Sequence, residues 1–153
     1  PVTRQLLDVF DRYGESVVAL EEVPPEKVSR YGVVDGSTVE DGVVLVRDFV
    51  EKPAPEEAPS NLAIASRYVL TPEIFTHLDH LPPGKNGEIQ LTDAMRRQVR
   101  QRAMYGLRFA GRRHDAGNKL DFLKTNLLYA LDRPDLHDDL AAFIIETADR
   151  LRR

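Results

Sequence analysis

The sequence contains no cysteine, no long apolar run and no signal-peptide pattern in residues 1–5. Without cysteine, disulfides, thiolate metal sites and cysteine nucleophiles are excluded, and a reducing compartment fits better than an extracellular one. No apolar stretch approaches the length of a membrane-spanning helix. These absences favour a cytoplasmic protein with no membrane partner.

The composition that is present is ordinary for a globular protein. The chain has 153 residues, of which 42% are hydrophobic and 30% charged, and this is enough for one domain with its own core. The net charge of −4 argues against a nucleic-acid partner, although arginines cluster within residues 95–102 and 108–113. We interpret the first cluster as the solvated face of a helix.

Helices and strands alternate along the chain, which is typical of a wound α/β sheet. We expect strands at residues 16–23, 31–35, 61–70 and 104–109, and a buried strand in the stretch 43–53. We expect helices at 3–10, from 71 to before 82, at 93–102, at 119–131, and from 138 or 139 to the end. Turns are expected at 35–37 and 40–42, and threonines 71 and 92 are expected to cap the helices that follow them.

The stretch 43–53 predicts a buried strand that ends in an acid, a base and a proline: Glu51, Lys52 and Pro53. In open α/β sheets, ligands bind in the crevice beyond the carboxyl ends of the strands. A carboxylate can accept several sugar hydroxyls while an ammonium neutralises phosphate, so this pair suits a sugar phosphate. The alternative is a strand that leaves the core through a charged turn.

Two further positions are candidates for contact with a sugar. Gly32, at a strand start, permits close approach of a ligand to the backbone, or it marks a bulge or bend. Glu88, in a loop, could contact a sugar hydroxyl or hold the loop by capping the helix that follows Thr92.

Asp115 lies in a Gly/Asn-rich turn between a strand and a helix. One carboxylate is a plausible half-site for Mg²⁺, which usually takes one or two carboxylates, waters and substrate phosphate oxygens. The alternative is an N-cap or Asx-turn for the helix that begins at Lys119. His114 beside it suits a positioning or surface role.

Several segments, taken in order, carry a family resemblance: YGVVD at 31–35, VEKP at 50–53, APSNLAI at 58–64, RYVL at 67–70, GEIQLTDA at 87–94 and HDAGNKL at 114–120. They resemble the bacterial UTP:glucose-1-phosphate uridylyltransferases, a family of sugar nucleotidyltransferases. The resemblance runs from about residue 3 to residue 131 and covers only the C-terminal half of that family. Its Gly-rich nucleotide loop has no counterpart here, so we expect a fragment.

The resemblance implies part of a Rossmann-like wound mixed β-sheet flanked by helices, of the nucleotide-diphospho-sugar transferase type with its N-terminal portion missing. Residues 1–131 would form the sugar-phosphate half of a nucleotidyltransferase domain. Residues 132–153 would form a C-terminal helix for packing or oligomer contact. The implied reaction joins UTP and glucose 1-phosphate into UDP-glucose and pyrophosphate.

The resemblance also implies roles for the five candidate residues. Lys52 would hold the sugar-phosphate oxygens, Glu51 and Glu88 would contact glucose, Gly32 would lie against the sugar, and Asp115 would complete a Mg²⁺ site and act with Lys52 in catalysis. The family resemblance implies homo-oligomers. Two alternatives stay open: a non-catalytic sugar-phosphate-binding or oligomerisation module, and a related transferase with another nucleotide or sugar. A nucleic-acid module is a distant third.

Overall fold

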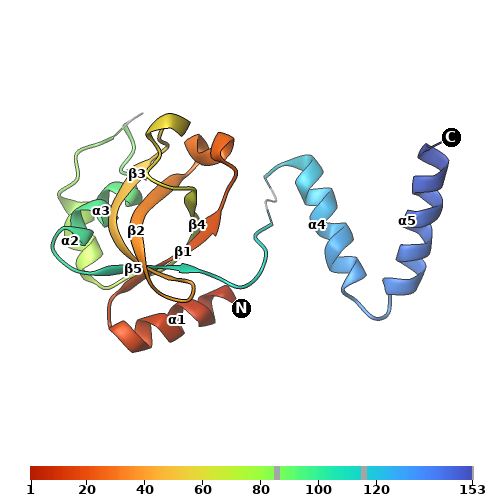
Figure 1. Cartoon of the computed structure of the whole chain (residues 1–153), viewed down its shortest axis with the longest axis horizontal. Helices are drawn as coiled ribbons and strands as arrows, with labels where there is room; N and C mark the ends of the chain where they lie inside the picture. The colour runs from red at the N-terminus through yellow and green to blue at the C-terminus, as the bar shows by residue number, and fades with distance from the viewer. Residues whose placement is uncertain (85–86, 115–116, 153) are drawn as a thin grey trace. The chain divides into compact units, whose positions relative to one another are not determined.

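The computed structural model describes residues 1–84, 87–114 and 117–152 (Figure 1). The chain divides into two compact units, residues 1–111 and 112–153, which are described separately. The division expected at residue 131 follows the extent of the family resemblance. The boundary between the two structural units lies earlier in the chain, between Gly111 and Arg112.

The first unit carries all the described strands and three of the α-helices. Its elements are α1 (Val2–Tyr13), β1 (Ser16–Glu22), η1 (Pro25–Arg30), β2 (Gly32–Glu40), β3 (Val43–Glu51), η2 (Pro55–Glu57), β4 (Leu62–Val69), α2 (Glu73–Asp79), α3 (Leu91–Val99) and β5 (Met104–Arg108). Gly14 ends α1 in the left-handed conformation at φ 66°, which a residue without Cβ adopts readily. The expected wound α/β unit is confirmed.

The sheet is mixed. Strand β1 pairs parallel with β5 and antiparallel with β4. Strand β3 pairs antiparallel with both β2 and β5, and β2 meets β4 at a single residue pair, Val33 with Ala63. Parallel strands need a long crossover connection, and the strands and helices between β1 and β5 provide it.

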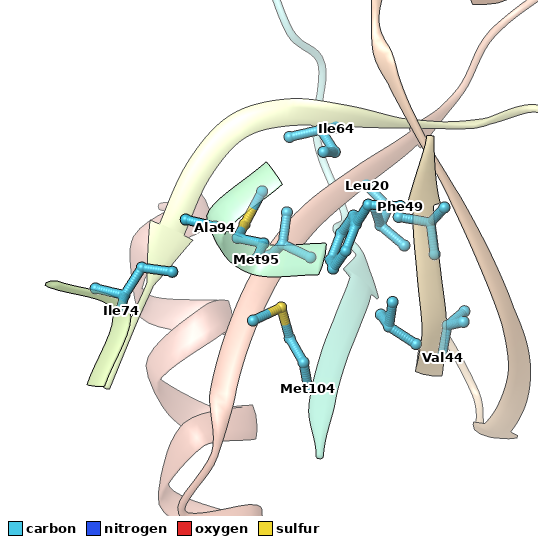
Figure 2. Packing of buried hydrophobic residues seen from close by; sticks show 11 residues of the cluster. Leu20, Val44, Phe49, Ile64, Ile74, Ala94, Met95 and Met104 are labelled. Carbon is cyan, nitrogen blue, oxygen red and sulfur yellow. The ribbon is translucent and has the colours of Figure 1, made fainter. Parts of the chain in front are cut away.

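Strand β1 is buried on both faces, because helices cover both sides of the sheet. Val17 and Ala19 point to one cluster, which includes Leu6 and Val9 of α1. The alternate residues point to a second cluster with α2 and α3, where Leu20, Phe49, Met95 and Met104 converge (Figure 2). This two-sided burial produces the nearly continuous apolar run of the β1 sequence.

Strand β3 is anchored in the second cluster by Phe49, whose side chain is 1% exposed. Truncation of such a buried aromatic side chain typically costs about 3–5 kcal/mol. The anchor lies two residues before Glu51, so the end of β3 has a fixed position.

The turn expected at residues 35–37 is wrong, because β2 continues through it to Glu40. A Cβ on Gly36 would lie 2.5 Å from Val44 Cγ1 and 2.6 Å from the Leu45 carbonyl oxygen. Glycine therefore serves close approach of β3, where the register shifts between Asp35 and Gly36. The turn at 40–42 is confirmed between β2 and β3.

The expected threonine caps are also wrong. Helix α3 begins at Leu91, so Thr92 lies inside its first turn. The Thr71 hydroxyl makes no cap to α2 and instead accepts a hydrogen bond from Gln98 Nε2 at 2.8 Å. Gln98 Nε2 also donates to Ser16 Oγ at 3.3 Å, and the Thr71 amide donates to the same oxygen at 2.9 Å. This buried triangle joins the start of β1, the start of α2 and the end of α3.

The arginines of α3 are not simply a solvated face. Arg96 donates twice to Asp48 of β3, with both N–O distances at 2.8 Å. This ion pair lowers the pKa of Asp48, with burial acting in the opposite direction and the Phe49 amide adding to the lowering. The helix also ends at Val99, earlier than expected, and residues of its last turn hydrogen-bond to Asp48 of β3 and Ser16 of β1.

The second unit contains α4 (Lys119–Leu131) and α5 (His137–Leu151). The bounds of α4 match the expected helix, and its start is capped by Asn118, whose side-chain oxygen accepts from the amides of Leu120 and Asp121. No described residue of either helix is buried, so the apolar side chains of both helices are half-exposed or exposed. Among the helices that the structure describes, none combines the length and apolar content of a bilayer span.

Candidate functional site

A pocket of about 180 Å³ lies where β2 begins and β3 ends. The pocket exists because Gly32 pairs with Glu51 in the antiparallel β2–β3 ladder. Side chains of β4 and α3 complete the wall; the lining residues are Arg30, Tyr31, Gly32, Glu51, Ile64, Ser66, Tyr68 and Thr92. The structure therefore brings together two of the predicted site residues, Gly32 and Glu51.

Gly32 forms the floor of this pocket. A Cβ there would lie 2.8 Å from Ile64 Cδ1, 3.1 Å from Glu51 Oε2 and 3.3 Å from Thr92 Oγ1. Any side chain at residue 32 would therefore fill space that two polar oxygens face. Of the two interpretations of Gly32 offered by the sequence, close approach is the one that this geometry favours.

Lys52 follows Glu51 directly and lies beside its carboxylate. Lys52 Nζ is 3.6 Å from Glu51 Oε1, and the Lys52 side chain is 57% exposed, which leaves the ammonium accessible to a ligand. The backbone of Lys52 has φ 47°, a left-handed conformation that costs a non-glycine residue about 1–2 kcal/mol. Its amide donates to the Tyr31 carbonyl at 2.9 Å, which holds the turned backbone in place.

The strand-end rule does not explain where the charged pair Glu51–Lys52 lies. The rule of carboxyl ends applies to parallel strands, whereas β3 is antiparallel to both of its neighbours. Glu51 reaches the pocket because a hairpin places the last residue of β3 opposite the first residue of β2.

Ser66 contributes a second strained position to the same pocket. Its φ is 52°, and Lys52 and Ser66 are the non-glycine residues with positive φ in the part of the chain that the structure describes. Such conformations persist where surrounding structure enforces them, and they concentrate at functional sites. Both strained residues lie at one pocket or directly beside it.

Tyr68 stands beside Ser66 in the pocket wall. Burial raises the pKa of the Tyr68 phenol, a hydrogen bond shared with the Ser66 side chain lowers it, and the Glu51 charge raises it. The phenol, the serine hydroxyl and the carboxylate therefore lie close enough together to influence one another.

Glu88 does not line this pocket. Its carboxylate accepts from Gln90 Nε2 at 3.3 Å, and its carbonyl accepts from the Gly84 amide at 2.8 Å. Neither of these contacts is a cap on α3, whose N-terminal residue makes no side-chain cap.

Thr92 is a lining residue that the sequence argument missed. Its hydroxyl had a plausible role as an N-cap, but α3 starts two residues earlier than expected, and the Thr92 hydroxyl lies toward Gly32.

Asp115, the expected magnesium ligand, lies outside the described residues. Its neighbour His114 is placed within the second unit, with Nδ1 3.2 Å from Thr125 Oγ1 and its ring centroid 5.2 Å from that of Tyr129. Among residues 1–84, 87–114 and 117–152, no group of three His, Asp or Glu side chains is placed to hold a metal ion.

Comparisons with known proteins agree on one family. The model of the Nucleotidyl transferase family matches residues 3–131. A UTP-glucose-1-phosphate uridylyltransferase of Staphylococcus epidermidis is 49% identical over 144 residues, covering 94% of this chain and 50% of that protein. The same enzyme of Streptococcus pneumoniae is 45% identical over 152 residues, covering 99% of this chain and 51% of that protein.

Solved structures give the same fold. A UDP-glucose pyrophosphorylase complexed with UDP-glucose superposes with a TM-score of 0.82 at 44% identity, covering 86% of this chain and 50% of that one. A UDP-glucose pyrophosphorylase from Acinetobacter baumannii gives a TM-score of 0.81 at 33% identity, covering 94% of this chain and 49% of that one. The chain spans about half the length of the curated relatives it matches.

Proposed function

The chain belongs to the nucleotidyl transferase family, and we propose that it supplies the sugar-phosphate-binding part of a UTP:glucose-1-phosphate uridylyltransferase, corresponding to the C-terminal half of that enzyme. The observation that carries the proposal is the pocket at Gly32, where the Glu51 carboxylate and the Thr92 hydroxyl face a backbone without a side chain, while the Lys52 ammonium lies beside that carboxylate at the edge of β3. The identity of 43–49% to curated uridylyltransferases supports the choice of reaction.

Each residue of the pocket has a role that follows from its chemistry. The Glu51 carboxylate accepts hydrogen bonds from ring hydroxyls, and the Thr92 hydroxyl can donate or accept beside it. The bare backbone at Gly32 lets the sugar ring lie against β2. The exposed ammonium of Lys52, beside Glu51, neutralises the phosphate of the same ligand.

In the proposed reaction, a phosphate oxygen of glucose 1-phosphate attacks the α-phosphorus of UTP in line, and pyrophosphate leaves. Little covalent chemistry is required of the protein, because positioning and charge neutralisation supply most of the rate enhancement. Lys52 would act in catalysis by holding the attacking phosphate and reducing its repulsion from the nucleotide.

We keep Mg²⁺ as part of the proposal. A carboxylate is a ligand type that Mg²⁺ accepts, and Asp115 would provide it, with the ion neutralising phosphate charge when bound. We also propose a cytoplasmic homo-oligomer for the complete enzyme. For the 153-residue chain by itself we propose sugar-phosphate binding without UDP-glucose synthesis.

A chimera tests the catalytic proposal. In it, this chain replaces the matching half of the Staphylococcus epidermidis relative, and pyrophosphate release from UTP and glucose 1-phosphate is followed by a coupled assay. Lys52→Ala is expected to reduce turnover by about a hundredfold or more, the usual effect of removing one charge from a preorganised site. Lys27→Ala, at an exposed lysine outside the pocket, is the matched control. Near-normal turnover of the Lys52→Ala chimera would contradict the assignment.

A further inference from the structure

Strand β4 is interrupted where it borders the pocket. Val18 pairs with Tyr68 and Leu20 pairs with Ile64, so one residue of β1, Ala19, faces three residues of β4. These three residues of β4 are Ala65, Ser66 and Arg67, two more than a regular ladder would place there. Irregularities of this kind redirect a side chain or end a ladder, and they are frequent beside active sites.

The interruption gives Ser66 its unusual backbone. Serine has no special tolerance for the left-handed region, and its φ of 52° is a cost that glycine would avoid at the same position. The two residues that precede Ser66, Ile64 and Ala65, are each 5% exposed and hold the strand on the N-terminal side of the strain.

The strain places a hydroxyl where it meets a polar group. The exposed Ser66 lines the pocket together with Gly32, Glu51 and Tyr68, and its side chain lowers the pKa of the Tyr68 phenol. Ser66 and Tyr68, two hydroxyl-bearing residues of β4, therefore line the same pocket as Thr92, whose hydroxyl faces Gly32.

We propose that Ser66 is a specificity-determining residue of this pocket, whose hydroxyl, paired with the Tyr68 phenol, binds one ring hydroxyl of the sugar phosphate. This inference rests on the proposed function of the pocket and deepens it. Strain that a glycine would remove is retained because the serine oxygen contacts the ligand. The ring hydroxyl concerned is one that Glu51 does not occupy.

The test is a cycle of protein and ligand changes on the 153-residue chain. Dissociation constants are measured by NMR titration for glucose 1-phosphate and its 2-, 3-, 4- and 6-deoxy analogues, with the wild type, Ser66→Gly and Ser66→Ala. Loss of one neutral hydrogen bond corresponds to an increase in Kd of about 2- to 12-fold. We expect this increase for glucose 1-phosphate in both variants, and we expect one deoxy analogue to bind the variants and the wild type equally.

Thermal unfolding separates a ligand role from a structural one. Ser66→Gly relieves the backbone and is expected to raise Tm by about 2–4 °C, while Ser66→Ala keeps the strain and gives no such gain. Ser37→Gly, at an exposed serine of β2 outside the pocket, is the matched control and should lower Tm without changing any Kd.

Two results would overturn the inference in distinguishable ways. In the first, the wild type and Ser66→Gly both bind glucose 1-phosphate and show the same ratios of Kd among the four deoxy analogues. This result would exclude Ser66 from the site and leave the proposed function intact. Absence of saturable glucose 1-phosphate binding by the wild type would overturn the proposed function and this inference together.

Discussion

Replacement of Gly32 by alanine tests the pocket most directly. The new Cβ would lie 2.8 Å from Ile64 Cδ1, about 1 Å closer than an ordinary carbon–carbon contact of roughly 3.5–4.0 Å. Ile64 is 5% exposed within the core, so it cannot withdraw freely. Such overpacking typically costs about 1–3 kcal/mol of stability.

Ligand binding should be weakened as well as stability. The same Cβ would lie 3.1 Å from Glu51 Oε2, so the carboxylate must move from the position in which it faces the ligand. Loss of one hydrogen bond to a charged group, worth about 1.5–3 kcal/mol, corresponds to an increase in Kd of about 10- to 150-fold.

Isothermal titration with glucose 1-phosphate measures this change in Kd, and circular dichroism checks folding. Gly84→Ala, whose added Cβ would have no contact closer than 3.4 Å, is the control. A folded Gly32→Ala chain that binds within twofold of the wild type would refute the placement of the ligand.

Two further predictions concern stability. The pKa of Asp48 is lowered chiefly by its hydrogen bonds to Arg96, so the stability that this pair contributes is present above the unfolded-state pKa of about 3.9 and is lost as pH falls through the lower folded-state pKa. Asp48→Asn should therefore lower the free energy of unfolding, measured by urea titration, by about 1 kcal/mol at pH 7, and this difference from the wild type should shrink below pH 4. Asp8→Asn, in the exposed Arg4–Asp8 pair, is the control and should have little effect at either pH. A loss of stability in Asp48→Asn that does not depend on pH would contradict the linkage. Asn118→Ala should destabilise the start of α4 by about 1 kcal/mol, seen as faster amide hydrogen exchange in its first turn, because the side chain accepts from two backbone amides. Asn126→Ala within the same helix removes a bond to a carbonyl only and should give no such increase; equal exchange in both variants would argue against the cap.

Strong local patterns were sufficient to predict most of the elements. The apolar run of β1 and the leucine-rich pattern of α4 each specify one structure, and both were found where the sequence placed them. The Asp35-Gly36-Ser37 segment misled because the same residues suit a turn and a close strand contact. Whether the segment forms a turn or a strand depends on its contact with Val44 and Leu45 of the neighbouring strand, which the residues of the segment themselves do not reveal.

The candidate site was predictable in part. Gly32 and Glu51 were singled out by residue type and by resemblance, and the β2–β3 register brings them together. Thr92 and Ser66 could not be found in this way. The first depends on where α3 begins, and the second depends on a backbone conformation that serine rarely adopts.

The buried triangle of Ser16, Thr71 and Gln98 has a consequence for the distant end of α3. Apolar side chains tolerate sliding of one helix along its neighbours, whereas directional hydrogen bonds at 2.8–3.3 Å close at a single position of the helix. Gln98 thus fixes how far α3 extends along its own axis. Thr92 lies six residues earlier in the same helix, so the position of α3 along its axis also determines whether the Thr92 hydroxyl reaches Gly32. A buried polar contact in the interior thereby positions one wall of the pocket.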